Sequence, residues 1–315
     1  MRRAYASASP TQSSNNIIWA GLGAAVIGGV VYYFNGSPQT DAKLMLLSRN
    51  DSAHGEPTFK GDDKWVDLKL KEIIKYNHNT SRFIFHLPTD EHVSGLHTAS
   101  AILTKYQGPE DDKPTMRPYT PISDTDRKGE MELLVKRYPN GPMSEKIHSM
   151  APDQRLSMKG PLPKYEWKPN KHEHLAMIAG GTGISPMYQI IRAIFKNPED
   201  KTKVTLVYGN ISEDDILLRE EFAHLENEFP NRFRGFYVVE KGSDKLSGQK
   251  GYITKDLLKT VMPSPSQGNK VHAFVCGPPG LYKAMSGMKP SPREQGDLTG
   301  ILKELGWQSD QVYKF

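Results

Sequence analysis

Cysteine is almost absent from this chain of 315 residues, which contains only Cys276. One thiol cannot form an internal disulfide, a cysteine-rich zinc site or a protein-ligated iron-sulfur cluster, because each of these needs more than one cysteine. The ten histidines show no metal-ligand spacing either. We therefore predict no metal site, and we interpret His172 and His174, which flank Glu173, as part of a solvated loop.

Acidic residues are missing from residues 1–40, whose only charged side chains are Arg2 and Arg3. The rest of the chain is nearly balanced, because the total formal charge is only +5 with 41 basic and 36 acidic residues. No basic stripe or nucleic-acid-reading motif is present, which argues against a nucleic-acid binder. A local basic patch that faces an acidic protein partner stays open.

One long uncharged run, IIWAGLGAAVIGGVVYYF, covers residues 17–34. As a helix it would be roughly 27 Å long, which is enough for a bilayer core, and Trp19, Tyr32 and Tyr33 lie where interfacial aromatics are favoured. We predict a transmembrane helix; a cleaved signal segment or a core helix is the alternative. Residues 1–16 have the composition of a mitochondrial targeting segment, and residues 35–63 that of a linker.

The remaining chain shows two hydrophobic patterns, which predict two domains at residues 64–167 and 168–315. In the first, apolar residues alternate with polar ones, as at Leu68 and Leu70 or Leu133 and Val135, and Pro/Gly/Asp turns separate the runs. Further short runs cover 83–87 and 101–106. This pattern predicts a small antiparallel β-barrel or sandwich.

Beyond Lys171 the pattern changes to strand, turn and helix, in the segments that begin LAMIAGG, KVTLVYGN and KVHAFVCG. Such alternation predicts a parallel α/β sheet, so the whole chain is of α+β type with two domains. Ligands of parallel sheets bind at the carboxyl ends of the strands, where Gly180 and Cys276 both fall. We expect these two turns to line one crevice.

Three motifs follow in a fixed order: RPYTPIS from Arg117, GGTGISPM from Gly180 and CGPPG from Cys276. In the first, Pro118 stiffens the backbone, Arg117 can grip a phosphate, and Tyr119 and Thr120 offer an aromatic face and a hydroxyl. This combination suits a flat cofactor that carries phosphate. An exposed Arg-Pro turn at a barrel rim is the structural alternative.

The segment VKRYPNGPMSEKI, which starts at Val135, offers a second phosphate contact. Gly141 admits close backbone approach and Ser144 can cap a helix that runs towards Ile147, so a pyrophosphate would fit there. A plain capped helix explains the segment equally well.

GGTGISP lacks the Gly-Lys-Ser/Thr of an ATPase phosphate loop and does not match G-x-G-x-x-G. It is a glycine turn from strand to helix in which Thr182 and Ser185 supply hydroxyls. CGPPG is a second tight turn that holds the Cys276 thiol at a strand end. Buried packing of a free cysteine is the alternative for Cys276.

These motifs resemble those of the NADH-cytochrome b5 reductases, within the ferredoxin-reductase-like flavoproteins, and above all their membrane-anchored fungal mitochondrial members. The resemblance covers roughly residues 65–315. It implies FAD as cofactor and NADH as substrate. The residues that it implies, together with Pro118 and Gly141 above, fall into three sets. The FAD-binding set is Arg117, Tyr119, Thr120, Leu134, Lys136, Tyr138, Met143 and Ser144. Thr182 and Ser185 resemble the family's contacts at the flavin and NADH side. The set that resembles the nicotinamide-nucleotide cleft is Gly180, Gly181, Gly183, Cys276, Gly277, Pro278 and Pro279. Glu240 matches an acid that engages the adenosine ribose and favours NADH over NADPH.

By this resemblance the catalytic residues are Thr120, Lys136, Thr182 and Cys276, and hydride passes from NADH to bound FAD before single electrons leave for a cytochrome b5-type haem protein. Three features depart from the family pattern: Leu281, Pro142 and the stretch Thr98–Ser100. The alternatives are a related NADH dehydrogenase with a quinone or other acceptor, and a membrane-tethered FAD/NADH sensor without turnover. We expect a monomeric body, anchored in the mitochondrial outer membrane by one helix; a processed form in the intermembrane space stays open, and the endoplasmic reticulum is less favoured.

Overall fold

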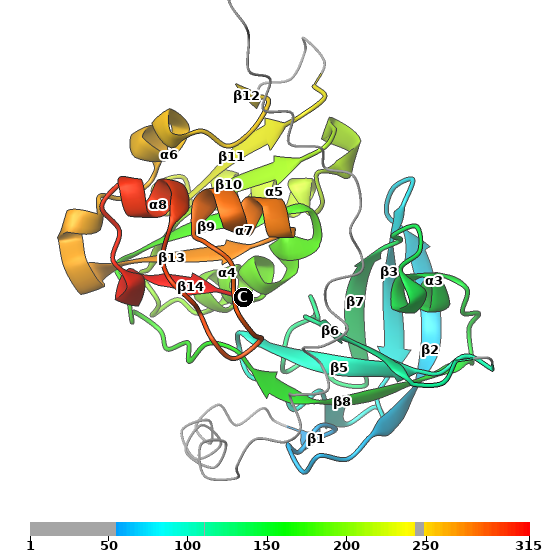
Figure 1. Cartoon of the computed structure of the whole chain (residues 1–315). Helices are drawn as coiled ribbons and strands as arrows, with labels where there is room; N and C mark the ends of the chain where they lie inside the picture. Colours follow the sequence, from blue (N-terminus) through cyan, green and yellow to red (C-terminus); the bar gives the residue numbers. More distant parts are fainter. Residues whose placement is uncertain (1–54, 110, 243–248) are drawn as a thin grey trace, which may run out of the picture.

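The computed structural model describes residues 55–109, 111–242 and 249–315, which form two six-stranded β-sheets, one small two-stranded sheet and the helices that pack on them (Figure 1). An antiparallel sheet lies within the first part of this range and a parallel sheet within the second. The two patterns predicted from hydrophobic periodicity therefore correspond to two different sheets.

The antiparallel sheet has six strands in the order β6-β5-β8-β2-β3-β7. They are β2 (Val66–Lys75), β3 (Thr80–His86), β5 (Ser100–Tyr106), β6 (Thr115–Tyr119), β7 (Glu130–Lys136) and β8 (Arg155–Pro163). Leu68 and Leu70 of β2 are buried while the residues between and after them are not, as the alternation predicts. Register shifts after Leu70 and Ala101 mark bulges, which bend a sheet.

The predicted barrel is closed by a helix and not by strand pairing. Within the residues that the structure describes, no pairing joins the edge strands β6 and β7. Helix α3 (Pro142–His148) contacts both of them and β5, and it places Met143 and Ile147 in the core that this sheet encloses. The helix thereby keeps water away from apolar surface between β6 and β7, where no strand pairing closes the sheet.

Part of the predicted linker packs against this domain. Strand β1 (Glu56–Pro57) pairs in parallel with β4 (His92–Val93), and Phe59 is buried in the core of the antiparallel sheet. Residues 55–63 therefore belong to the folded body. The rest of that linker, the predicted targeting segment and the predicted membrane span at residues 17–34 lie outside the described residues. In the described part of the chain, no helix has the length and apolar character needed to cross a membrane.

The parallel sheet has six strands in the order β12-β11-β10-β9-β13-β14. They are β9 (His174–Gly180), β10 (Lys203–Asn210), β11 (Phe233–Val239), β12 (Gln249–Lys250), β13 (Val271–Cys276) and β14 (Val312–Lys314). The first strand, β9, lies in the centre with β10 on one side and β13 on the other. The chain order thus reverses at the carboxyl end of β9, which is where open α/β sheets bind ligands.

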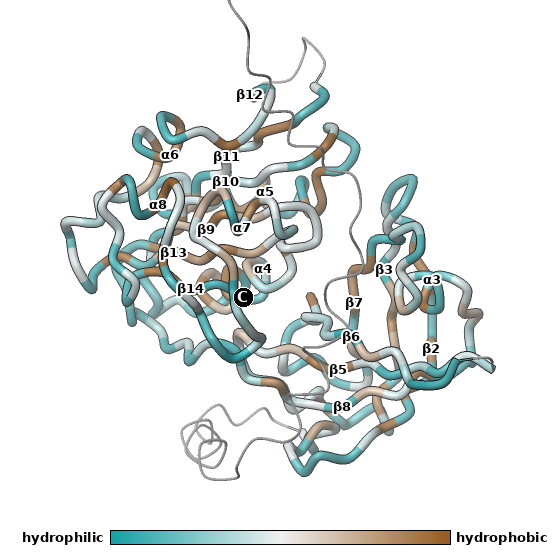
Figure 2. The backbone as a smooth tube through the Cα atoms, in the orientation of Figure 1, coloured by the Kyte–Doolittle hydropathy of each residue, from teal (hydrophilic) through white to brown (hydrophobic). Residues whose placement is uncertain are grey.

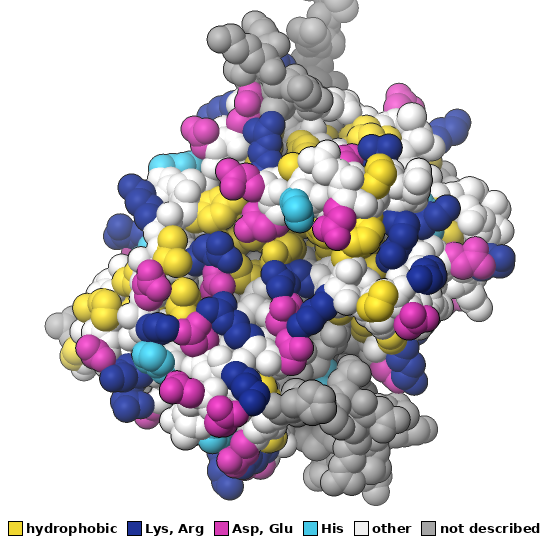
Figure 3. All heavy atoms as spheres, turned by 180° about the vertical axis from the view of Figure 1, so that it is seen from behind, with side chains coloured by type: hydrophobic (Ala, Val, Ile, Leu, Met, Phe, Trp, Pro, Cys, Tyr) yellow, Lys and Arg dark blue, Asp and Glu magenta, His cyan; other side chains and the backbone are white. Residues whose placement is uncertain are grey.

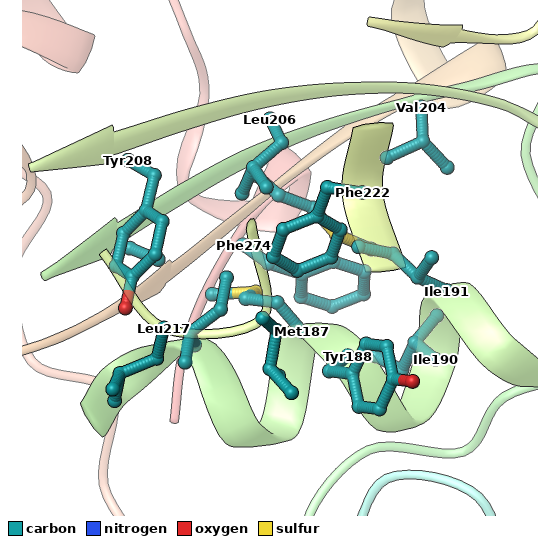
Figure 4. Close-up of a cluster of buried hydrophobic side chains, with 14 of the residues drawn as sticks. Met187, Tyr188, Ile190, Ile191, Val204, Leu206, Tyr208, Leu217, Phe222 and Phe274 are labelled. Carbon is teal, nitrogen blue, oxygen red and sulfur yellow. The ribbon is translucent and has the colours of Figure 1, made fainter. Parts of the chain in front are cut away.

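Helices cover both faces of the parallel sheet. They are α4 (Ile184–Lys196), α5 (Arg219–Glu228), α6 (Lys255–Val261), α7 (Pro279–Met285) and α8 (Gly300–Glu304). Side chains of α4 and α5 pack on one face, and those of α6, α7 and α8 on the other. Figure 4 shows the first cluster, with Met187 and Ile191 of α4 next to Phe222 of α5 and Phe274 of β13. In Figure 2, brown hydrophobic segments occur along the central strands of the parallel sheet and along strands of the antiparallel sheet such as β3 and β7.

The core between α4, α5 and the parallel sheet extends across the boundary between the domains. Ala99, Ile122 and Leu134 come from the antiparallel domain but belong to the same buried cluster as the α4 side chains. A shared core resists independent movement of two domains, since separation would expose apolar surface to water. The charges outside are mixed in sign on the face that Figure 3 shows.

Two local predictions were wrong. His172 is buried and not in a solvated loop, because Tyr165 donates to or accepts from its Nε2 at 2.8 Å and His272 stacks on it at 4.7 Å between ring centroids. His174 lies in β9 and bonds Thr205. Among the described residues, no group of three or more His, Cys, Asp or Glu could hold a metal ion.

Candidate active site at the junction of the two sheets

The two glycine turns of the parallel domain pack directly against each other. A Cβ atom on Gly183 would lie 2.2 Å from the carbonyl oxygen of Cys276, and one on Gly277 would lie 2.6 Å from a methyl carbon of Leu281. Gly180 is similarly close to Pro278, at 3.0 Å. Only residues without a side chain allow this approach. The crevice expected from the sequence is therefore built by backbone contact between the ends of β9 and β13.

Gly181 has a different role in the same turn. Its φ of +53° is in the left-handed region, and a Cβ there would meet nothing within 4 Å. Its carbonyl oxygen accepts a 2.8 Å hydrogen bond from the hydroxyl of Tyr208, which is fully buried in β10. Tyr208 therefore holds the turn from the protein interior, while the space beside the Gly181 Cα is open to a ligand.

Thr182 connects this turn to the antiparallel domain. Its Oγ1 lies 3.1 Å from the hydroxyl of Tyr138, which follows β7 and is 46% exposed. Tyr138 of the predicted FAD-binding set and Thr182, predicted at the flavin and NADH side, are thus brought into hydrogen-bonding contact from the two domains. Ser185, in the first turn of α4, is buried just behind them.

The RPYT segment forms β6 and its end. Arg117 and Tyr119 are half-buried, Pro118 is exposed and Thr120 follows the last strand residue. The Arg117 guanidinium donates to the carbonyl of Met116 at 2.8 Å. Burial raises the pKa of the Tyr119 hydroxyl, so this group stays protonated and can donate.

Lys136, at the end of β7, makes an ion pair across the domain boundary. Its ammonium lies 2.9 Å from Oδ1 of Asp215, and both side chains are largely buried. Although burial alone would raise the pKa of Asp215, hydrogen bonds from Lys136 and Ser212 lower it. The amide of Asn79 reaches the same carboxylate at 3.5 Å. The lysine is therefore held in place by a carboxylate of the other domain.

The α3 segment differs from the prediction in detail. Gly141 is the N-cap of the helix, and Pro142 takes the first helical position, for which its fixed φ is suited. Ser144 is therefore inside the first turn and does not cap it. Its hydroxyl accepts from the backbone N–H of Tyr138 at 3.1 Å and donates to the carbonyl of Gly141 at 2.9 Å. It fixes the turn that carries Tyr138.

Three predicted residues do not place their side chains at the junction: two are buried in the cores, and the third lies further along the edge of the parallel sheet. Leu134 and Met143 are 3% and 1% exposed, inside the two cores, so they can offer only backbone groups to a ligand. Glu240 directly follows β11, two strands from β9. At about 4.8 Å per strand it lies on the order of 10 Å along the same edge, a separation that an extended dinucleotide spans.

Cys276 ends β13 and is half-buried beside the crevice. Burial raises the pKa of its thiol to about 11, so the thiol is neutral near pH 7. Pro278 and Pro279, which cap and begin α7, hold the turn after it. The departure at Leu281 is accommodated, because its side chain is buried against Gly180 and Gly277.

Sequence reasoning missed Asp215 and Tyr208, which are both contacts of predicted residues. The signal for Asp215 was present as a capping box, since Ser212 and Asp215 satisfy each other at the start of a short 3-10 helix, η3 (Glu213–Asp215). Nothing local marks Tyr208, whose partner Gly181 is 27 residues away.

Comparison with known proteins matches the segments of the two six-stranded sheets to two different domain families. The description "Oxidoreductase FAD-binding domain" matches residues 67–167, and "Oxidoreductase NAD-binding domain" matches residues 177–287. A protein of Phaeosphaeria nodorum named NADH-cytochrome b5 reductase 2 is 53% identical over 99% of this chain and 95% of its own length. The chain belongs to the NADH-cytochrome b5 reductase family. A protein of the same name from Emericella nidulans is 56% identical, again over 99% of this chain and 95% of its own.

Solved structures of this family and of related reductases have the same arrangement of domains. The cytochrome b5 reductase domain of Ulva prolifera nitrate reductase is 28% identical, with a TM-score of 0.73, and covers 82% of this chain and 99% of that one. A ferredoxin NADP+ reductase from Neisseria gonorrhoeae with bound FAD and NADP is 16% identical with a TM-score of 0.62, over 81% and 99% of the two chains, which shows likeness of fold. The chain is a flavoprotein oxidoreductase with one FAD-binding and one NAD-binding domain.

The residues at the junction fit FAD. Arg117 has guanidinium donors left for a phosphate, since its hydrogen bond to Met116 uses only one of them. Tyr119 adds a half-buried ring, and Tyr138 contacts Thr182 of the glycine turn. A flat ring system held by β6 would thus have one edge towards the NAD-binding domain.

Proposed function

We propose that the protein is an NADH-cytochrome b5 reductase, which oxidises NADH and reduces a cytochrome b5-type haem protein one electron at a time. The observation that carries this proposal is the contact between Tyr138 and Thr182, 3.1 Å between the two oxygens. It brings the flavin-side segment of one domain to the glycine turn at the switch point of the other. Bound FAD supplies the chemistry, because it accepts a hydride and releases electrons singly.

The chain's own residues would then mainly position the two nucleotides. Arg117 would bind the FAD pyrophosphate, and Tyr119 and Thr120 would lie along the ring system. Thr182 would orient the nicotinamide amide group through its hydroxyl, from a turn whose open side faces outwards at Gly181. Lys136, charged and largely buried beside Asp215, would stabilise negative charge at the junction.

Cys276 fits a role in positioning better than one in covalent chemistry. A nucleophilic cysteine needs a lowered pKa, whereas the pKa of this thiol is raised to about 11 by burial. A neutral, polarisable thiol beside the crevice can pack against a planar ring. Glu240 would bind the adenosine ribose and repel a 2′-phosphate, which favours NADH over NADPH.

Stopped-flow absorbance tests the proposal. The purified full-length protein in detergent is mixed anaerobically with NADH and then with oxidised cytochrome b5. Rapid loss of the flavin absorbance band followed by haem reduction is the expected result. Flavin bleaching without haem reduction would leave an NADH dehydrogenase with a quinone or other acceptor. A folded, FAD-loaded protein that NADH does not bleach would contradict the proposal and favour a sensor without turnover.

We further propose that residues 17–34 anchor the protein in the mitochondrial outer membrane. The support is the uncharged run of 18 residues, which follows an arginine-bearing, acid-free segment. Carbonate extraction and protease protection of isolated mitochondria would test the anchor. Release of the protein by carbonate, or its recovery with endoplasmic reticulum, would contradict it.

A further inference from the structure

Helix α4 carries a polar stripe along the side that faces the antiparallel domain. The stripe consists of Gln189, Arg192 and Lys196, which are three and four residues apart and so share one face of the helix. The same helix begins directly after the glycine turn of Gly181 to Gly183. Any shift of this stripe would therefore move the turn as well.

All three stripe residues bond one short segment, residues 121–126, directly after the RPYT motif. Arg192 forms a two-pronged ion pair with Asp124, with Nε 2.7 Å from Oδ1 and Nη2 2.6 Å from Oδ2. Lys196 pairs with Asp126 at 2.7 Å and reaches Asp124 at 3.4 Å. The fork-to-fork geometry fixes both distance and direction, which a lysine cannot do.

Gln189 adds a buried contact between α4 and the antiparallel domain. It is 5% exposed, its Oε1 accepts from the backbone N–H of Ser100 at 3.0 Å, and its Nε2 donates to the carbonyl of Pro121 at 3.4 Å. Ser100 belongs to the stretch where this chain departs from the family pattern. A buried amide with both ends satisfied holds its two partners in register.

Arg192 lies well away from the glycine turn at the start of its helix. It is eight residues beyond Ile184, which is about 12 Å along the helix axis from the glycine turn. Its Nη1 donates to the hydroxyl of Tyr188, on the preceding turn of the same helix, at 3.2 Å, and its other side-chain hydrogen bonds within the described residues go to Asp124. Although burial alone would raise the pKa of Asp124, the Arg192 and Lys196 charges lower it, so the pair stays ionised.

We propose that Arg192 and Asp124 are positioning residues for hydride transfer, which set the distance between the flavin held by β6 and the nicotinamide held by the glycine turn. The proposal rests on the proposed function. Asp124 follows the RPYT segment by four residues, and Arg192 lies on the helix that begins directly after the glycine turn. The pair therefore acts on geometry, and its loss would reduce the rate of hydride transfer more than the affinity for either nucleotide.

The test compares Asp124→Asn and Arg192→Lys with the wild type, each as the full-length FAD-loaded protein mixed anaerobically with NADH. The limiting rate of flavin bleaching at saturating NADH should fall about 10-fold in Asp124→Asn, because small misplacements of reacting atoms are costly. Arg192→Lys, which keeps the charge and loses the fork, should fall about 3-fold. The NADH dissociation constant and the FAD content should change less than about 2-fold.

Lys255→Gln is the matched control, since the Lys255–Glu304 pair at 2.9 Å joins two helices of the same domain. It should leave the limiting rate unchanged. A second readout is the kinetic isotope effect with NADH deuterated at the transferred position, which should be larger in the two variants than in the control.

Limiting rates equal to the wild type in FAD-loaded variants would overturn the proposal. Equal losses of rate, NADH affinity and FAD content would also overturn it, because they indicate a purely structural role. If Asp124→Asn does not retain FAD, Arg192→Lys decides by the same criteria. Failure of the wild type to bleach with NADH is a different outcome, which contradicts the proposed function and not this pair.

Discussion

The antiparallel domain presents side chains to the junction, whereas the parallel domain presents mostly backbone. Arg117, Tyr119 and Lys136 stand on strands β6 and β7, and each could be altered without moving its strand. In contrast, Gly183 and Gly277 matter through the side chains that they lack. Substitutions in the first domain should therefore weaken one interaction at a time, and those at the glycines should disturb the whole site.

Gly183→Ala should have the largest effect. The new methyl group would lie 2.2 Å from the carbonyl oxygen of Cys276, so the ends of β9 and β13 would have to separate. We expect a loss of roughly 3 kcal/mol in the free energy of unfolding and of about 100-fold in flavin reduction by NADH. Urea unfolding and stopped-flow bleaching would measure these.

Gly181→Ala is the control for this prediction. Its methyl group meets no atom within 4 Å, and only the positive φ of +53° opposes it. The expected cost is about 1 kcal/mol. Equal losses for the two alanine variants would show that close backbone contact is not what makes this turn sensitive.

Arg117→Ala should leave the fold intact and weaken FAD binding about 30-fold, since a charged hydrogen-bonding partner of a phosphate contributes about 2 kcal/mol. Titration of the apoprotein with FAD measures the affinity. Arg234→Ala, which removes an exposed arginine paired with Glu226, is the control and should have no effect. FAD affinity unchanged by Arg117→Ala would remove this residue from the flavin site.

Asp215→Asn should cost roughly 2 kcal/mol of unfolding free energy, because it leaves the largely buried Lys136 without its carboxylate. The pKa of Asp215 is lowered in the folded protein, so this contribution is complete above the ordinary value of 3.8 and is lost as the pH falls through the folded pKa. Urea unfolding of both proteins should show a constant difference from about pH 7 to about pH 5. A difference that is already lost at about pH 5 would contradict the ion pair.

Glu240→Gln should raise the ratio of kcat/KM for NADPH to that for NADH about 10-fold, since it removes the charge that repels a 2′-phosphate. This carboxylate is a side chain in the domain that otherwise relies on backbone. FAD content serves as the control and should not change. An unaltered ratio would place nucleotide selection elsewhere.

The smallest expected effect concerns the Cys276 thiol. With its pKa raised to about 11, it should not titrate between about pH 6 and pH 9, so it should add no step to the pH profile of flavin reduction. Alkylation by iodoacetamide should be slow at pH 7 and accelerate as the pH rises towards 11. Fast alkylation at pH 7 would show that the thiol is ionised.

The features that sequence predicted well are those set by local pattern. Strand β10 covers the predicted segment KVTLVYGN, and Gly180 and Cys276 end neighbouring parallel strands as expected. Ser144 was misplaced because proline at position 142 starts the helix earlier than a serine cap would.

The features that sequence could not predict depend on partners far away in the chain. Lys136 finds Asp215 at a separation of 79 residues, and Arg192 finds Asp124 at 68. His172 looked solvated because its neighbours are polar, yet Tyr165 and His272 enclose it. Such pairs form only when the two sheets dock. The hydrophobic periodicity within either sheet gives no information about that docking.

The stacked histidines have a consequence for the joint between the domains. Burial lowers the pKa of His272 to about 3, and the neighbouring His172 and Lys171 lower it further. Burial also lowers the pKa of His172. Unfolded histidine binds a proton below about pH 6.5, so folding loses stability as the pH falls from there towards the lower folded values. Because Tyr165 packs on both rings, protonation of these histidines should loosen the segment that connects β8 with β9.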